Sequence, residues 1–207
     1  EIPLRLVGSE MCIRDRAMNK GHSSLTSWGL EHMNIERTAT VLDIGCGGGK
    51  TVDRLCSIVA NGKVYGIDYS ELSVKSSEKL NSKNILCNKA KILQASVSDM
   101  PFDDNTFDNI TAVETYYFWP DKENDVKEVF RVLKQGGTVM LLFEMLRTDD
   151  DPFKWEKVEN MLNIKSVTPQ EIRAVLESAG FENINTYTKE GTTWLCATAQ
   201  KPKDDEN

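Results

Sequence analysis

The chain contains 207 residues, of which 40% are hydrophobic and 28% charged, and this size and composition suit one globular domain. Its net charge of -7 at pH 7 argues against a nucleic-acid partner, because a polymer of phosphates is bound by a basic surface. Five cysteines without CxxC spacing argue against a disulfide framework or a zinc knuckle, and no apolar run has the length of a membrane span. We therefore expect a cytoplasmic protein without a metal site, whereas the oligomeric state is not indicated.

Residues 1–16 do not resemble the remainder of the chain. They lack a hydrophobic period, and their last six letters, MCIRDR, resemble a translated sequencing adapter. We expect this segment to be a non-native leader, followed by a single domain over residues 17–202 and a charged tail over residues 203–207. Leu25, Trp28, His32 and Ile35 share one helical face and predict a helix at the start of that domain.

Short apolar segments then alternate with helical patterns. Strands are predicted at residues 41–42, 64–67, 92–95, 109–113 and 138–143. Helices are predicted around residues 52–59, 71–80 and 126–133, the last closed by Gly136 and Gly137, and at residues 155–162 and 168–179. The two last strands, around 183–188 and 192–199, form a hairpin. This alternation predicts an α/β fold with a mostly parallel sheet covered on both faces. The charged segment 144–166 interrupts it, either as a solvated connection or as a lid over a site.

The glycine-rich loop after the first strand, TVLDIGCGGGKT from Thr40 to Thr51, is the main functional signal. Glycines between a strand and a helix allow a ligand to approach bare backbone, next to the open N–H groups of the helix. A phosphate-binding loop of the Walker type needs glycine five residues before Gly49, where Ile44 stands. A dinucleotide fingerprint needs glycine where Lys50 stands. Asp68, after the second strand, suits the ribose hydroxyls of either a dinucleotide or another nucleoside.

Four segments together resemble the class I S-adenosylmethionine-dependent methyltransferases, over most of the chain from Met18 to Pro202. They are the loop 41–49, Asp68 in the place of the ribose-binding acid, the stretch 100–108 (MPFDDNTFD), and the segment 131–137 (RVLKQGG). The resemblance implies a Rossmann-like, doubly wound sheet of seven strands with the last strand antiparallel. It also implies S-adenosylmethionine as the cofactor.

The same resemblance implies which residues hold the cofactor. Gly45 and Gly47 let the backbone approach its methionine part, while Asp43 and Glu114 answer the amino group. Asp68 is expected at the ribose, and the neighbouring Tyr69 is also expected among the cofactor-binding residues. The family usually carries an acid at the position of Ser96, so Ser96, with its uncharged hydroxyl, and the backbone of Val97 are expected at the adenine; Asp99 is the nearest alternative acid.

The aromatic run from Tyr116 to Trp119 falls after the fourth strand, at the edge of the sheet where ligands bind in such folds. It is either ordinary packing or an aromatic wall for the sulfonium or the acceptor, and Tyr116 is a candidate catalytic residue. His22 is the candidate general base, His32 suits a packed position, and Cys46 is a small spacer in the loop. Methyltransferases that act on the amino groups of nucleobases carry the sequence Asn/Asp-Pro-Pro-aromatic after the fourth strand. This chain has Glu114-Thr115-Tyr116-Tyr117 at that place, which disfavours exocyclic amines of bases as acceptors.

We thus expect methyl transfer from S-adenosylmethionine to a small-molecule acceptor, whose identity is not indicated. Two other hypotheses remain at this point. One is an oxidoreductase with a nicotinamide cofactor, against which the spacing of the loop argues. The other is a module that binds S-adenosylmethionine without transferring its methyl group.

Overall fold

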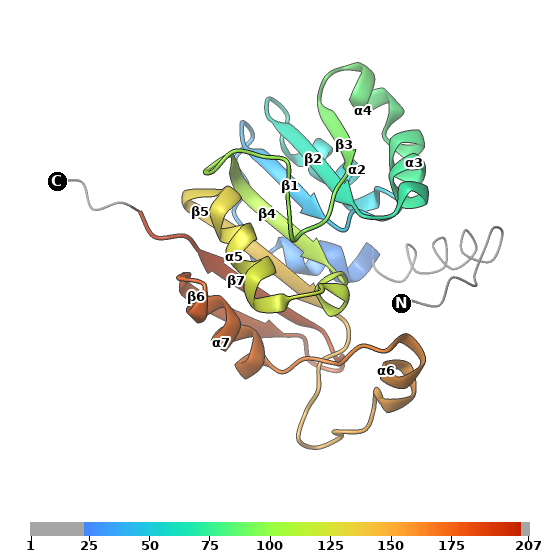
Figure 1. Cartoon of the computed structure of the whole chain (residues 1–207), viewed down its shortest axis with the longest axis vertical. Helices are drawn as coiled ribbons and strands as arrows, with labels where there is room; N and C mark the ends of the chain where they lie inside the picture. Colours follow the sequence, from blue (N-terminus) through green and yellow to red (C-terminus); the bar gives the residue numbers. More distant parts are fainter. Residues whose placement is uncertain (1–22, 204–207) are drawn as a thin grey trace.

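The computed structural model describes residues 23–203 as a seven-stranded sheet with helices on both faces (Figure 1). The expected leader 1–16, His22 and residues 204–207 lie outside this range. The strands are β1 (Thr40–Ile44), β2 (Lys63–Asp68), β3 (Ala90–Gln94), β4 (Phe107–Val113), β5 (Leu133–Phe143), β6 (Glu182–Thr188) and β7 (Leu195–Gln200). Their order in the sheet is β3-β2-β1-β4-β5-β7-β6, and β7 runs antiparallel to both neighbours. The predicted fold is therefore confirmed.

Successive side chains along a strand point alternately to the two faces of the sheet, where they join different hydrophobic clusters. Leu42 and Ile110 face the larger cluster with α5 and α7, whereas Val41 and Val64 face α2 and α3. A helix over residues 23–30 covers the same face farther along, above β5 and β7. The helices are α2 (Lys50–Ile58), α3 (Glu71–Leu80), α4 (Ser82–Leu86), α5 (Lys122–Val132), α6 (Glu156–Leu162) and α7 (Pro169–Ser178), with a 3₁₀ turn η1 (Tyr116–Phe118). None of the helices within residues 23–203 is both long and apolar enough to cross a membrane.

The strand order places the site. β1 lies between β2 and β4. From β1 the chain adds β2 and β3 toward one edge of the sheet, and it then crosses back to place β4 on the other side of β1. Ile44 pairs with Ile67 of β2 and with Ala112 of β4, so the carboxyl ends of all three strands meet at one edge. In open α/β sheets ligands bind in the crevice outside the carboxyl ends at such a switch point.

Two predicted helix ends are wrong. The first helix ends at residue 30, and hydrogen bonds of the i→i−3 type from Glu31, His32 and Met33 tighten its last turn, so that Ile35 is not helical. Gly136 and Gly137 do not close α5 but lie inside β5. Their backbone groups pair with Lys201 beyond β7, and a Cβ atom on Gly137 would lie 2.7 Å from the carbonyl oxygen of Lys134.

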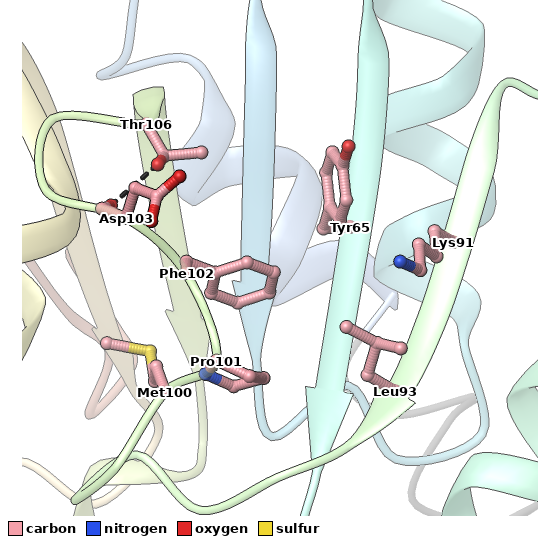
Figure 2. A pocket seen from close by; sticks show the side chains of 8 residues that line it. All are labelled: Tyr65, Lys91, Leu93, Met100, Pro101, Phe102, Asp103 and Thr106. Atoms are coloured by element: carbon pink, nitrogen blue, oxygen red, sulfur yellow. Dashed lines mark hydrogen bonds between the residues drawn. The ribbon is translucent and has the colours of Figure 1, made fainter.

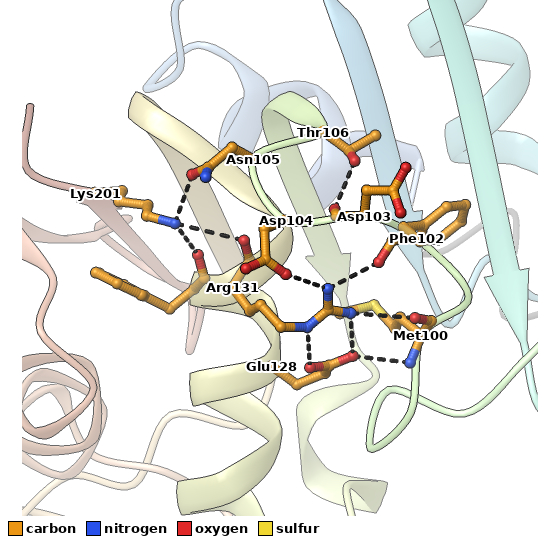
Figure 3. A network of polar contacts seen from close by, with 10 residues as sticks. Met100, Phe102, Asp103, Asp104, Asn105, Thr106, Glu128, Arg131 and Lys201 are labelled. Atoms are coloured by element: carbon orange, nitrogen blue, oxygen red, sulfur yellow. Dashed lines mark hydrogen bonds and ion pairs between the residues drawn. The ribbon is translucent and has the colours of Figure 1, made fainter.

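The two later motifs of the sequence, 100–108 and 131–137, meet in the structure (Figure 3). The guanidinium of Arg131 donates to the carbonyl oxygens of Phe102 (2.8 Å) and Met100 (3.2 Å) and pairs with Asp104 (2.7 Å). Glu128 pairs with the same guanidinium and also accepts from the backbone N–H of Met100 (2.9 Å). α5 thus holds the loop that follows β3. Its Arg131 and Glu128 side chains bind backbone groups of Met100 and Phe102 that no helix or strand pairs.

Candidate cofactor site

The glycine loop between β1 and α2 adopts a backbone that favours glycine at three positions. Gly45, Gly47 and Gly49 have φ angles of 68°, 50° and 82°. A Cβ atom on Gly45 would lie 2.1 Å from Oγ1 of Thr115, whereas one on Gly47 would have no described atom within 4 Å. Gly45 is therefore required by close packing against the segment after β4. Gly47 leaves open space in front of the bare backbone.

The start of α2 has no side-chain cap within residues 23–203. Gly49 is its N-cap residue, and within the described chain no side chain caps the helix. The loop is held from behind by Asn81, whose side-chain amide donates to the carbonyl oxygen of Gly49 (3.0 Å). The first N–H groups of α2 therefore have no capping side chain among the described residues, and together with the positive end of the helix dipole they suit an anionic group such as a carboxylate.

Asp68, at the end of β2, ties the glycine loop to the neighbouring strand. Its carboxylate accepts from the backbone N–H of Gly47 (2.9 Å, Oδ2) and from that of Ser70 (2.9 Å, Oδ1). Carboxylate oxygens at this position are also suitable acceptors for donors such as ribose hydroxyls. The structure thus brings the predicted ribose acid beside the predicted loop.

Asp43 lies beneath the loop and is 2% exposed. It accepts a hydrogen bond from the hydroxyl of Thr111 (2.7 Å), the residue that faces it on β4. Burial raises the pKa of Asp43 to about 7, and the nearby charge of Asp68 acts in the same direction against the Thr111 hydrogen bond. This carboxyl group is partly protonated near neutral pH unless a cation lies beside it.

Glu114 is the first residue after β4 and has a positive φ of 57°. Its Oε1 accepts from the hydroxyl of Tyr117 (3.4 Å) and from the backbone N–H of Glu144, at the end of β5. Burial raises the pKa of Glu114 to about 8. A non-glycine residue in this backbone region is strained, and such strain concentrates at functional sites.

The predicted adenine residues lie in the turn after β3. The hydroxyl of Ser96 accepts from the backbone N–H of Ser98 (3.2 Å), while Val97 is buried in the larger core cluster. Asp99, the alternative acid, is exposed, and so is Tyr69, with 68% of its surface accessible. The exposed ring of Tyr69 and the serine hydroxyl can offer a flat face and a hydrogen bond to a base.

The aromatic run after β4 is divided between core and surface. Tyr116 is 5% exposed and packs on Trp119 (5.2 Å between ring centroids) and Phe143 (5.6 Å), whereas Phe118 is 53% exposed. Burial raises the pKa of Tyr116 to about 12, so its hydroxyl stays protonated and cannot act as a base near neutral pH. His22, the candidate base, lies outside the described residues, and its role stays a prediction.

His32 lies away from the cofactor residues. It stacks on Tyr187 of β6 with ring centroids 4.0 Å apart and meets the edge of Trp28. This is the packed position that the sequence predicts for it. Cys46 is buried, as expected of a spacer, and burial raises the pKa of its thiol.

Two polar neighbours of the site, Thr111 and Thr115, were not assigned from the sequence, and Tyr117 was placed only in the aromatic run, without its bonds to Glu114 and Met145. Thr111 had a signal, because a polar residue inside the apolar strand 109–113 needs a partner. The other two depend on how the segment after β4 folds back onto the glycine loop and β5. Hydrophobic periodicity and motif spacing in the sequence do not predict contacts of this kind.

A hollow of about 460 Å³ lies elsewhere, on the face of the sheet over β2 and β3 (Figure 2). Tyr65, Lys91 and Leu93 form its floor, and the loop from Met100 to Thr106 forms its wall. The ring of Phe102 meets those of Tyr65 and Phe107 edge to face, at 5.7 Å and 4.8 Å between centroids. The stretch 100–108 therefore packs on the sheet beside this hollow instead of lining the glycine loop.

No group of three or more His, Cys, Asp or Glu side chains within residues 23–203 could hold a metal ion. The four cysteines in that range are free thiols.

Comparisons with known proteins agree with this geometry. The family model described as "Methyltransferase domain" matches residues 42–141. The uncharacterized methyltransferase YdaC of Bacillus subtilis is 27% identical over 183 residues, which cover 87% of this chain and 93% of YdaC. The ubiquinone/menaquinone biosynthesis C-methyltransferase UbiE of Cronobacter sakazakii is 31% identical over 181 residues, which cover 76% of this chain and 72% of UbiE.

A solved structure shares the fold at lower identity. Human N-acetylserotonin methyltransferase, in complex with S-adenosylmethionine, superposes with a TM-score of 0.75 and 18% identity, covering 94% of this chain and 56% of that one. The strand order, the glycine loop and these relatives agree: the chain belongs to the class I S-adenosylmethionine-dependent methyltransferases, and S-adenosylmethionine is its cofactor.

Proposed function

We propose that this protein transfers a methyl group from S-adenosylmethionine to a small, mainly apolar acceptor, with the cofactor held on the glycine loop. The observation that carries the proposal is a pair of carboxyl groups at one edge of the sheet: the buried Asp43 near the end of β1 and the half-buried Glu114 just after β4. Within residues 23–203 neither forms an ion pair with a lysine or arginine. Buried carboxylates of this kind favour a cationic ligand, and the cofactor has both an ammonium and a sulfonium group.

The remaining parts of the cofactor fit the neighbouring residues in the same way. The methionine carboxylate suits the open N–H groups at the start of α2, past the bare backbone of Gly47. The ribose hydroxyls suit Asp68, and the adenine suits the exposed ring of Tyr69, the hydroxyl of Ser96 and the backbone of Val97. Gly45 lets the backbone approach the methionine part, and its lack of a side chain also permits close packing against Thr115.

The bound cofactor supplies an activated methyl carbon on a cationic sulfur. What the chain must add is mainly alignment of the acceptor and exclusion of water, because the transfer is an in-line displacement. The aromatic run after β4 lies at the correct edge of the sheet for this purpose. Tyr116, with a pKa raised to about 12, can serve there as a hydrogen-bond donor but not as a base.

Exposed apolar side chains near the carboxyl edge support an apolar acceptor. Phe118 follows β4, and Phe153 and Met161 belong to the segment 144–166 that follows β5; they are 53%, 72% and 63% exposed. All residues of α6 are at least partly exposed, and only Val158 of α6 and the preceding Trp155 pack against the larger core cluster, so α6 is only partly packed on the domain, as a cover for a bound molecule would be. The names of relatives such as UbiE point to acceptors of the same apolar class.

Two buried polar atoms close to Tyr116 support a polar group on that acceptor. Nε1 of Trp119 and Oδ1 of Asp125 have no hydrogen-bond partner among the described residues. Trp119 contacts the Tyr116 ring, and the charge of Asp125 contributes to raising the pKa of Tyr116. One donor and one acceptor suit a hydroxyl group, which can both accept and donate.

The test has two stages. Calorimetric titration with S-adenosylhomocysteine measures cofactor binding, and the enzyme with tritium-labelled S-adenosylmethionine is then incubated with an organic-phase extract or with polar metabolites. Label transferred to the organic-phase extract supports the proposal. Transfer only to polar metabolites would refute the apolar acceptor, and binding without any transfer would favour a module that only holds the cofactor.

A further inference from the structure

The hydroxyl of Tyr117 joins the segments that follow the neighbouring strands β4 and β5. It donates to Oε1 of Glu114 (3.4 Å) and accepts from the backbone N–H of Met145 (2.9 Å). The side chain is 4% exposed, and its ring packs against Phe143 at 5.6 Å between centroids. The position of the hydroxyl is therefore fixed both by packing and by the backbone after β5.

Glu114 has one carboxyl oxygen committed to this arrangement. The backbone N–H of Glu144 and the hydroxyl of Tyr117 both reach Oε1, and these are its side-chain hydrogen bonds within residues 23–203. The backbone N–H of Glu114 also donates to the carbonyl oxygen of Leu142 (2.9 Å). These contacts hold Glu114 at a φ of 57°, which a residue with a side chain adopts only when its surroundings impose it.

We propose that Tyr117 is a positioning residue for the cofactor: it fixes Oε1 of Glu114 so that Oε2 faces the ammonium group of the cofactor's methionine part. This inference rests on the proposed contact between Glu114 and that ammonium group. Burial keeps the Tyr117 hydroxyl protonated by raising its pKa well above the ordinary value, so that the hydroxyl remains a donor to the carboxylate. The separation of 3.4 Å is long for an O–H···O bond, so the loss of the hydroxyl has a moderate effect.

The test compares two ligands in calorimetric titrations of Tyr117→Phe. S-adenosylhomocysteine has the amino-acid part, and 5′-methylthioadenosine keeps the nucleoside and the thioether but lacks it. The variant keeps the ring and its packing, and we expect it to weaken S-adenosylhomocysteine about three- to tenfold while changing 5′-methylthioadenosine less than about twofold. Tyr187→Phe is the matched control, because it removes a tyrosine hydroxyl from a ring that stacks on His32, away from the site.

Glu114→Gln separates this inference from the role of Glu114 itself. If Glu114→Gln weakens S-adenosylhomocysteine selectively and Tyr117→Phe does not, the positioning role is refuted while the Glu114 contact stands. If Glu114→Gln has no selective effect, the Glu114 contact fails and the inference with it. The double variant is expected to bind no more weakly than Glu114→Gln alone, and an equal loss for both ligands in Tyr117→Phe would refute positioning in favour of a purely structural role.

Discussion

Gly45→Ala tests the close packing of the glycine loop against the segment after β4. The new Cβ atom would lie 2.1 Å from Oγ1 and 2.6 Å from Cβ of Thr115, so the loop or Thr115 must move. Relieving such overpacking costs about 1–3 kcal/mol, and holding alanine at a φ of 68° costs about 1–2 kcal/mol. The stiffer unfolded chain returns about 0.4–1 kcal/mol. We expect the free energy of unfolding to fall by about 2–4 kcal/mol.

Gly47→Ala is the matched control, because Gly47 also has a positive φ but open space in front of it. It lacks the steric part and should lose no more than about 1.5 kcal/mol of the free energy of unfolding. Its methyl group projects instead into the space proposed for the cofactor. Gly47→Ala should therefore weaken S-adenosylhomocysteine at least about tenfold in a fold that is nearly as stable as the wild type.

Urea denaturation of both variants measures the difference. A loss of 2–4 kcal/mol in a domain of this size corresponds to a melting temperature lower by roughly 5–15 °C. Thr115→Gly removes both clashing atoms, so the double variant with Gly45→Ala should recover part of the loss, leaving the cost of the backbone angle. Equal stabilities of Gly45→Ala and Gly47→Ala would show that the steric argument is wrong.

Three further predictions concern the core contacts, the pH dependence and the acceptor side. Arg131→Ala removes the hydrogen bonds to Met100 and Phe102, and we expect urea denaturation to show a loss of about 1–3 kcal/mol, against less than about 0.5 kcal/mol for the exposed Arg173→Ala. The raised pKa values of Asp43 (about 7) and Glu114 (about 8) mean that the ligand-free fold holds these protons more tightly than the unfolded chain. Their contribution to stability therefore falls as the pH rises from about 4 to about 8, and Asp43→Asn should reduce the difference between melting temperatures at pH 5 and pH 8; an unchanged difference would contradict the burial argument. Phe118→Ser should slow methyl transfer to the organic-phase extract while leaving S-adenosylhomocysteine affinity and melting temperature unchanged, since Phe118 is half exposed; equal rates would remove it from the acceptor side.

Much of the fold follows from local patterns. The apolar segments around residues 41–44, 64–67 and 109–113 form parallel strands. Asp43, Asp68 and Glu114 lie at or next to the carboxyl ends of these strands, so the three side chains gather at one edge of the sheet. The errors come from competition that the local sequence does not show. Glycines often end a helix, but Gly136 and Gly137 lie in β5. Their backbone groups form hydrogen bonds with the backbone of Lys201, which is distant in sequence.

In the candidate site, too, local sequence predicts some features, and long-range contacts decide the others. The types and spacing of the loop residues and the acids predict a cofactor cradle, because each lies at the end of a predicted strand. What holds these residues could not be predicted: Thr111 under Asp43, Thr115 behind Gly45, and Tyr117 on Glu114. These contacts depend on the register between strands and on the path of the chain after β4, which long-range packing decides.

The central claim is that the cofactor lies on the glycine loop with its ribose on Asp68. Titration of S-adenosylhomocysteine into Asp68→Ala tests it most directly. Asp53→Ala is the control, because it removes another carboxylate, in the first turn of α2, without touching the ribose position. We expect Asp68→Ala to lose at least about tenfold in affinity, as charged hydrogen bonds to two hydroxyls require, with Asp53→Ala close to wild type. Wild-type affinity in a folded Asp68→Ala variant would contradict this binding mode.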